Sequence, residues 1–288
     1  MQSAGVKDSA LTIHGSLQAE RLGKVLAKRD LELTHIFSSD LQRAVKTAAA
    51  LRSWNDAAQP GCNIEVTALK VLREQDFGYY EGKPFYARPR DSSKSGKENH
   101  RLQQQDDPDF QDVESKDSMA SRMNDFLRDH LIPLIHKDAA AKEKAVAIVS
   151  HGIILSHLWR TFLKLLPKDS VSLAPGVSIG SGGVTPLEYL GGWSNTGYLE
   201  LDVQKRSQEK TGRNAVCSAS SQFPERAHSP ISESSLSSCK VIIKTVNGKA
   251  HLQGLKRTKG GVGSAKFDEG QKSIDSFFKK RKVTTDQG

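Results

Sequence analysis

The feature that most constrains the fold is an apolar run, AVAIV at residues 145–149, which ends in Ser150, His151 and Gly152. Five consecutive small or β-branched apolar residues are typical of a strand buried on both faces, as in a parallel sheet. The apolar stretch that follows predicts a helix over residues 152–166. His151 is therefore expected where a strand ends and a helix begins, a place that favours anions. This pattern indicates phosphate chemistry.

Charge is divided unevenly along the chain. Residues 1–202 hold 25 lysine and arginine residues against 26 aspartate and glutamate residues, whereas residues 203–288 hold 17 against 7. The net charge of +9 thus comes from the end of the chain, and it says nothing about what the body binds. No run of 18 apolar residues predicts a membrane span, so no membrane partner is expected. The three cysteines fit neither a disulfide framework nor a zinc site, which favours an intracellular protein without a metal.

Strands and helices are expected to alternate through residue 203. This order predicts an α/β fold with a mostly parallel sheet flanked by helices. Thr12 and Asp40 are the predicted helix caps. Polar residues 83–117 are interpreted as an insertion loop, and residues 204–288 as a disordered basic tail. The expected helices are 12–29, 41–53, 118–135 and 152–166, and the expected strands are 34–37, 64–66, 145–150 and a closing pair at 185–191 and 198–203.

Two further positions have residue types suited to phosphate chemistry. Arg43 is expected in the first turn of a helix that follows a strand, where a guanidinium can contact phosphate through two bonds. Glu74 lies among aromatic residues and glycines in LREQDFGYYEG, residues 72–82, and a carboxyl group in such surroundings can act as a general acid. Each has an ordinary explanation when taken alone: a solvated arginine, an exposed acidic loop and, for His151, a structural histidine.

Taken together, four ordered blocks resemble the histidine phosphatase superfamily, also called phosphoglycerate mutase-like. They are residues 8–19, 38–48, 72–82 and 149–152, with Asn195-Thr196 also similar, and the resemblance covers about residues 5–203. It implies a neutral histidine that attacks phosphorus to form a phosphohistidine, without a metal or other cofactor. By matching position, it makes Arg43 a phosphate clamp, His151 the second histidine of the phosphate pocket, Gly152 an amide donor and Glu74 the acid and base.

The chain departs from this family pattern at the nucleophile. The resemblance places the nucleophilic histidine in an Arg-His-Gly motif that ends an apolar first strand ahead of Asp8, and the sequence as given has no such motif. His14-Gly15 does not substitute, because no apolar strand precedes it and its block already matches the next part of the pattern. We therefore interpret residues 1–203 as a domain that lacks its first strand and is inactive as written. An incomplete gene product is favoured over a genuine loss of catalysis, because a strand missing from inside a sheet leaves unpaired ladder groups.

The tail contains a second kind of motif. Its sequence QKSIDSFF resembles the box that binds the sliding clamp, proliferating cell nuclear antigen, and the basic run after it resembles a nuclear import signal. In a short turn this spacing projects an aliphatic side chain and two aromatic ones as a hydrophobic plug. The alternative for QKSIDSFF is a tail end that associates non-specifically through its exposed phenylalanines. The alternative for the basic run is a solvated charge run that contacts nucleic acid only non-specifically. The residues concerned are Gln271, Ile274, Phe277 and Phe278 for the clamp and Lys279, Lys280, Arg281 and Lys282 for an import receptor.

Two functions follow from these motifs. The first is a phosphomonoester hydrolase, a phosphatase that works through a phosphohistidine on a phosphorylated substrate. The alternative is a non-catalytic nuclear adaptor that binds the sliding clamp through its tail. The tail predicts a nuclear location, with a cytoplasmic one otherwise. Mutase activity would use the same residues, and the substrate cannot be read from the polar 83–117 segment.

Overall fold

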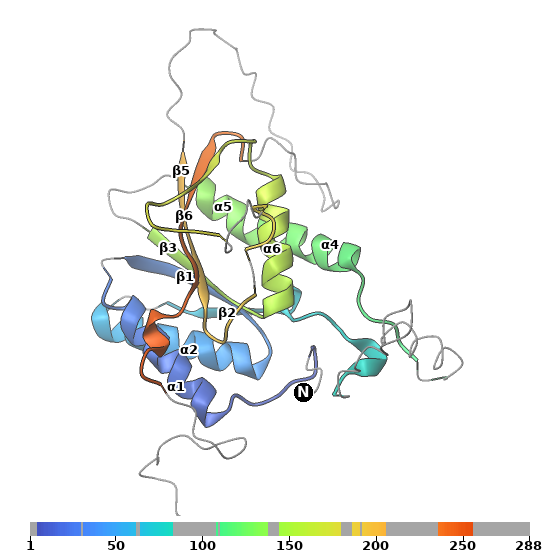
Figure 1. The fold of residues 1–288 in the computed structure, drawn as a ribbon. Coiled ribbons are helices and arrows are strands. Elements are labelled where there is room, and N and C mark those ends of the chain that lie inside the picture. Colours follow the sequence, from blue (N-terminus) through green and yellow to red (C-terminus); the bar gives the residue numbers. More distant parts are fainter. Residues whose placement is uncertain are drawn as a thin grey trace, which may run out of the picture.

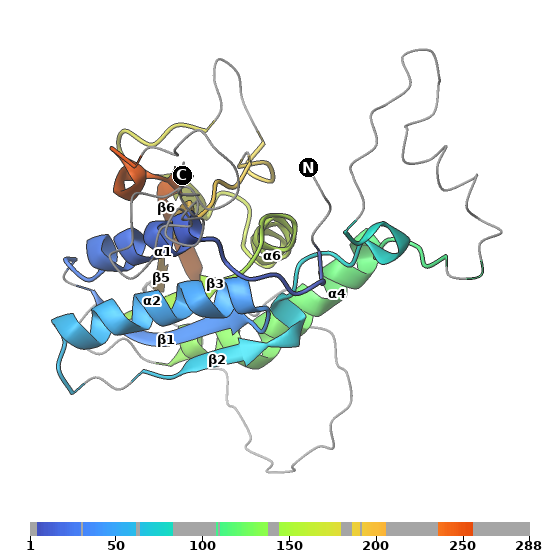
Figure 2. The same ribbon diagram turned by 90° about the horizontal axis from the view of Figure 1, so that it is seen from below.

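The computed structural model describes nine segments of the chain: residues 5–29, 31–61, 64–82, 108, 110–137, 144–179, 186–190, 192–205 and 236–255. Within them, two three-stranded sheets lie between two groups of helices (Figures 1 and 2). The expectation of an α/β fold with parallel strands flanked by helices is confirmed. The predictions for residues outside these segments, including most of the 83–117 loop, concern residues that the structure does not describe.

The first sheet has the strand order β2-β1-β3, and both of its pairs are parallel. It consists of β1 (Glu32–Ser39), β2 (Val66–Leu69) and β3 (Lys144–Val149). Because side chains alternate along a strand, neighbouring residues of β1 enter different cores. Ile36 packs in the cluster that contains Leu22 and Leu51, whereas Phe37 packs with Phe126 on the other face. One central strand therefore joins both cores.

Helices α1 (Ile13–Leu26) and α2 (Gln42–Ala58) cover one face of this sheet. Thr12 caps α1 as predicted, because its Oγ1 accepts a hydrogen bond from the Gly15 N–H at 3.1 Å. Small residues bring the two helices close together. Ala48 is fully buried, and a side chain at Gly23 would lie 2.8 Å from the Ala50 carbonyl oxygen. The alanine-rich sequence of α2 therefore serves packing as well as helix propensity.

The opposite face is covered by α4 (Lys116–Phe126), a π-helical turn (Leu127–Leu131), α5 (Ile132–His136) and α6 (Gly152–Lys164). The helix predicted over 118–135 is thus one helical stretch with a change of hydrogen-bonding pattern. Pro133 follows the π-helical turn, and a proline has no N–H to donate to the preceding turn. The fully buried side chains Met119, Met123, Phe126 and Ile154 form the centre of this larger core.

The second sheet corrects two of the predictions. Its order is β4-β6-β5, with β4 (Val171–Leu173), β5 (Tyr198–Lys205) and β6 (Cys239–Gly248). The predicted disordered tail at 204–288 is wrong for residues 236–255, which are folded. The predicted strand at 185–191 is also wrong for residues 186–190, because β6 is the antiparallel partner of β5.

The reason for both errors is a short alternation inside the tail. Cys239, Val241 and Ile243 are buried, whereas Lys240 is exposed, Ile242 is only partly buried, and Lys244 after them is exposed. This period of two is the pattern of a strand with one buried face. The serine-rich residues ahead of β6 conceal this pattern, because they dominate the composition of any stretch much longer than the strand.

Four strand edges stay open within the described part of the chain: those of β2 and β3 in the first sheet and those of β4 and β5 in the second. One edge of β3 and one edge of β5 have no partner strand. The two strands nevertheless line the same core: Tyr198 at the start of β5 and Ala147 and Val149 of β3 all pack against the cluster that contains Leu22 and Ile36. The prediction that β3 is buried on both faces is wrong, since Ala145 to Val149 are only partly buried. The physical reason is that β3 is an edge strand here.

Replacing Ile243 by alanine tests the packing of β6. The side chain is fully buried, so the variant should lose about 2–5 kcal/mol of unfolding free energy. Lys244→Ala, on the exposed side of the same strand, should change it by no more than about 0.5 kcal/mol. Urea denaturation of both variants measures the difference. Equal and small losses would contradict the placement of β6 in the core.

Candidate active site

His151 and Arg43 meet at the end of β3. His151 is the residue before α6, and Arg43 lies in the first turn of α2, as the sequence predicted. The Arg43 Nε–H donates to His151 Nδ1 at 3.2 Å. Burial, together with the adjacent Arg43 charge, lowers the pKa of His151 to about 3. The imidazole is therefore neutral at physiological pH, with Nδ1 as the hydrogen-bond acceptor.

The remaining Arg43 donors bind the start of the described chain. Its two Nη groups donate to the carbonyl oxygens of Lys7 at 3.1 Å and Gly5 at 2.6 Å. The same segment is held from the other side, where the Glu81 carboxylate accepts the amide N–H groups of residues 5–7. Burial lowers the pKa of Arg43, and the carboxylates of Glu74, Asp8 and Glu81 oppose this shift. A guanidinium remains charged under these conditions.

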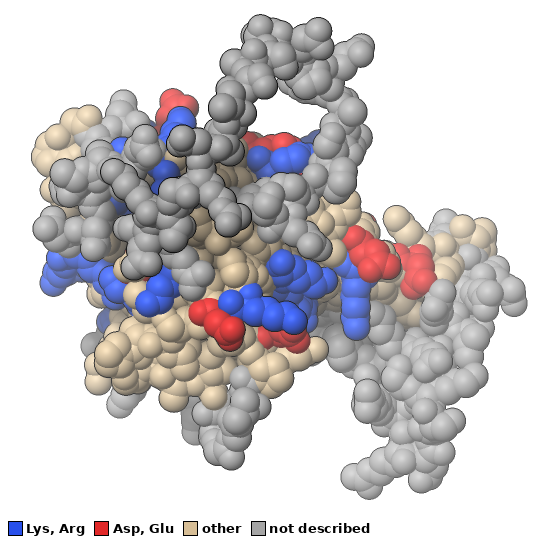
Figure 3. Space-filling view, turned by 90° about the horizontal axis from the view of Figure 1, so that it is seen from above, with Lys and Arg blue, Asp and Glu red and all other residues tan. Residues whose placement is uncertain are grey.

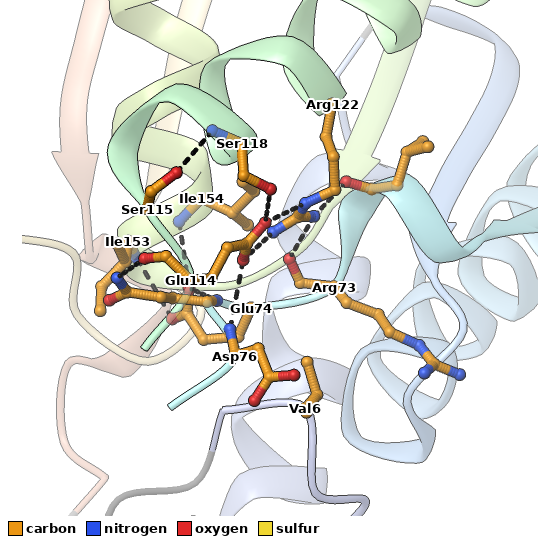
Figure 4. Close-up of polar contacts among 12 residues, drawn as sticks. Val6, Arg73, Glu74, Asp76, Glu114, Ser115, Ser118, Arg122, Ile153 and Ile154 are labelled. Atoms are coloured by element: carbon orange, nitrogen blue, oxygen red, sulfur yellow. Dashed lines mark hydrogen bonds and ion pairs between the residues drawn. The ribbon is translucent and has the colours of Figure 1, made fainter. Parts of the chain in front are cut away.

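Glu74 lies at the amino end of α6. Its side chain is buried, and its carboxylate accepts the N–H groups of Ile153 at 3.2 Å and Ile154 at 3.1 Å (Figure 4). It therefore satisfies two of the amides that a helix leaves unpaired at its start. Gly152 precedes them, and its amide has no hydrogen-bond partner among the described residues. The structure thus brings all four predicted pocket residues, Arg43, Glu74, His151 and Gly152, to one helix end.

Asp40 has a different partner from the one expected. It was predicted to cap the helix after β1, but Leu41 is the cap residue and makes no side-chain cap. The Asp40 carboxylate instead accepts two bonds from Arg73, from Nε and from Nη2, both at 2.6 Å. This two-bond pairing with the Arg73 guanidinium lowers the pKa of Asp40. It also fixes the residue before Glu74 to the end of β1.

A polar cleft of about 370 Å³ lies beside Glu74. Arg122 closes one side of it, donating to both oxygens of Glu114 and to the backbone carbonyls of Val71 and Arg73 (Figure 4). Burial raises the pKa of Glu114, but the bonds from Arg122 and Ser118 bring it below its ordinary value. Sequence reasoning missed this pair, since no spacing rule connects residues 114 and 122. The cleft is lined by Val6, Lys70, Arg73, Glu74, Asp76, Gln111, Asp112, Glu114, Ser118 and Arg122.

Other expectations concern metals, membranes and the charged surface. Among the described residues, no group of three or more acidic, histidine or cysteine side chains could hold a metal ion. None of the described helices has the length and apolar composition needed to cross a bilayer. On the face seen in Figure 3, basic side chains lie beside acidic ones instead of forming one continuous patch. The clamp-binding and import residues, 271–282, lie outside the described residues.

The neutral state of His151 predicts a pH dependence of stability. In the unfolded chain this histidine takes up a proton near its ordinary pKa of 6.5, whereas in the folded chain it does so only near pH 3. Between these two pH values the unfolded state binds more protons than the folded state, so acid lowers the free energy of unfolding. This one group lowers it by at most about 1.4 kcal/mol per pH unit. Thermal denaturation from pH 7 to pH 4 should show a shallower fall for His151→Asn. Parallel curves would contradict a buried neutral imidazole.

Comparison with known proteins gives the family. The family model of the histidine phosphatase superfamily (branch 1) matches residues 2–191. A probable phosphatase of Schizosaccharomyces pombe is 25% identical over 281 residues, which cover 95% of this chain and 72% of that protein. A probable phosphoglycerate mutase of Citrobacter koseri is 34% identical over 164 residues, or 56% of this chain and 66% of that protein.

A solved structure, mycobacterial hydrolase 1, shares the fold. Its TM-score is 0.50 at 20% identity, and the match covers 86% of this chain and 92% of that one. The family model ends at residue 191, whereas the match to the S. pombe protein extends over most of the remaining chain. On the strength of the family match and the shared fold, this chain belongs to the histidine phosphatase superfamily, branch 1.

Proposed function

We propose that this chain contributes the phosphate pocket of a phosphomonoester hydrolase that works through a phosphohistidine. The observation that carries the proposal is the Arg43–His151 contact at the start of α6, with Glu74 bound to the same helix end. A neutral imidazole, a guanidinium and a free amide at one place are suited to a phosphoryl group. Arg43 is the phosphate clamp, His151 the second histidine, and Gly152 the amide donor.

The chemistry assigns Glu74 a proton-transfer role. A histidine nitrogen attacks phosphorus, an N–P bond forms, and the P–O bond to the leaving alcohol breaks. Glu74 first takes up a proton from solvent, gives it to the leaving oxygen, and then takes one from the water that hydrolyses the phosphohistidine. Arg43 must first exchange its carbonyl partners, Gly5 and Lys7, for phosphoryl oxygens. Such an exchange is favourable because hydrogen bonds to a charged acceptor are about twice as strong as bonds to a neutral one.

The nucleophile is the part that the sequence as given lacks. We propose that it belongs on a strand between β3 and β5. The open edges of these strands and the partly exposed apolar side chains of β3 support this position. A strand parallel to β3 there would end beside His151, because the carboxyl ends of parallel strands meet at one edge of a sheet. An Arg-His-Gly motif at that end would complete the pocket.

Adding the strand tests this proposal. The chain as written should not turn over p-nitrophenyl phosphate, whereas a chain with an apolar segment ending in Arg-His-Gly joined ahead of Gly5 should. The matched control has the same segment ending in Arg-Ala-Gly. Robust turnover by the chain as written would refute the missing-nucleophile hypothesis, and an inactive extended chain that folds would refute the strand position.

Arg43 is expected to carry much of the transition-state stabilisation in the extended chain. Arg43→Ala should lower kcat by about 100-fold or more, the usual loss for a preorganised donor to a developing charge. Arg52 lies on the same helix and pairs with Asp56 on the surface, so Arg52→Ala should leave kcat unchanged. Equal effects of the two substitutions would contradict a clamp role for Arg43. Product analysis in the presence of a second hydroxyl acceptor separates phosphatase from mutase activity.

The tail supports a second, independent proposal. We propose that residues 271–278 bind the sliding clamp and that residues 279–282 direct nuclear import, because the spacing of Gln271, Ile274, Phe277 and Phe278 fits a hydrophobic plug. Recovery of the clamp in a pull-down should be lost when Phe277 and Phe278 are both alanine. Alanine at Lys272 is the control, since that position lies outside the plug. Unchanged recovery by the double variant would contradict clamp binding.

A further inference from the structure

Trp193 lies against the first turn of α6, the helix that begins directly after His151. Its indole Nε1–H donates to Ser156 Oγ at 2.9 Å, and the Ser156 hydroxyl donates to the Gly152 carbonyl at 2.8 Å. The side chain also touches Gly152 itself: a β-carbon there would lie 3.7 Å from Trp193 Cβ and 3.9 Å from Cδ1. The indole thus stands beside the amide donor of the phosphate pocket.

The segment around Trp193 is fixed by the carboxyl-terminal part of the fold. Asn247 on β6 accepts the Ser194 N–H at 3.0 Å and donates to Ser194 Oγ at 3.2 Å. His251 shares a hydrogen bond of 2.9 Å with Thr196 Oγ1. Thr196 and Asn247 both adopt left-handed backbone conformations, with φ of +54° and +46°, which persist only where the surroundings hold them.

We call residues 192–197 the Trp193 loop. The hydrogen bonds from Asn247 and His251 hold this loop in place. A side chain at Gly197 would lie 2.1 Å from Asn247 Oδ1, so the loop and β6 are in close contact. A ring held on such a support loses little conformational freedom when a ligand binds. The loop also contains no charged residue, in contrast to the polar cleft on the Glu74 side.

The three tryptophans of the chain have different surroundings. Trp159 is only 3% exposed and belongs to the core, and Trp54 on α2 lies under the Lys24 ammonium group. Trp193 is partly exposed although its N–H is satisfied. A rigid indole with a satisfied N–H and an accessible ring is suited to stacking on a flat ligand surface.

We infer that Trp193 forms the apolar wall of the phosphate pocket and selects phosphomonoesters whose leaving group has an aromatic ring. This inference rests on the proposed function, because it needs phosphate to bind at Arg43 and Gly152. The phosphoryl group binds at the helix end, and the ring of the leaving group stacks on the indole. Ser156 is a positioning residue, since it orients the indole through Nε1 without touching the ligand.

Binding, not turnover, tests this inference on the chain as it exists. Phenyl phosphate, inorganic phosphate and glycerol 3-phosphate are titrated by calorimetry, with Trp emission followed in parallel. Phenyl phosphate should bind at least fivefold more tightly than the other two. Trp193→Ala should reduce that preference to less than twofold without weakening inorganic phosphate, and Trp193→Phe should keep most of it while removing the emission change. Trp54→Phe, the matched control, should keep both.

The outcomes separate this inference from the proposed function. Suppose that Arg43→Ala no longer binds inorganic phosphate, while Trp193→Ala still prefers phenyl phosphate as strongly as the unchanged chain. This result would overturn the role of Trp193 and leave the phosphate pocket standing. A wild-type chain that binds phosphate without any preference for phenyl phosphate would do the same. A folded chain that binds none of the three ligands would overturn the phosphate pocket and the Trp193 wall together. Circular dichroism confirms that each variant is folded.

Discussion

The buried Glu74 carboxylate is the interaction on which the rest of the site depends. Its bonds to the amides of Ile153 and Ile154 tie residues 72–82 to the start of α6. Ser150 supports the same junction, because its hydroxyl donates to the Leu72 carbonyl at 2.6 Å. A buried carboxylate needs such partners, since desolvation without them is costly. The strand end, the helix end and the acidic segment are therefore fixed as one unit, and His151 lies at their junction.

This arrangement uses up many of the donors that make a helix end attractive to anions. Glu74 occupies two amides of α6, and backbone carbonyls occupy the Nη groups of Arg43. Among the described residues the Gly152 amide has no hydrogen-bond partner, and the Arg43 contacts to neutral carbonyls are ones that a charged ligand can replace. Under the proposed function, specificity for a phosphoryl group would come from exchange at Arg43 next to a neutral His151. A ligand without a strong negative charge would not displace Gly5 and Lys7.

The sequence predicts those features of the site that depend on residues close together in the chain. His151 at a strand end, Arg43 in a first helical turn and the Thr12 cap follow from short-range periodicity and from the unpaired amides of helix ends. The Asp40–Arg73 pair did not follow, because Asp40 is also a good cap residue and only the tertiary fold supplies the guanidinium. Arg122 and the Trp193 loop were missed for the same reason. Their partners come from segments that no spacing rule relates to them.

The carboxyl-terminal segment shows how a short pattern decides the boundary of a domain. Composition averaged over residues 204–288 predicts disorder, yet three alternating buried residues, Cys239, Val241 and Ile243, are enough to place β6 between β4 and β5. Once β6 is in the sheet, Asn247 at its end lies under Ser194, and His251 follows against Thr196. The wall beside His151 therefore depends on residues about 100 positions further along the chain. Because these residues lie on and after the buried strand β6, the same segment that completes the second sheet also holds the Trp193 loop.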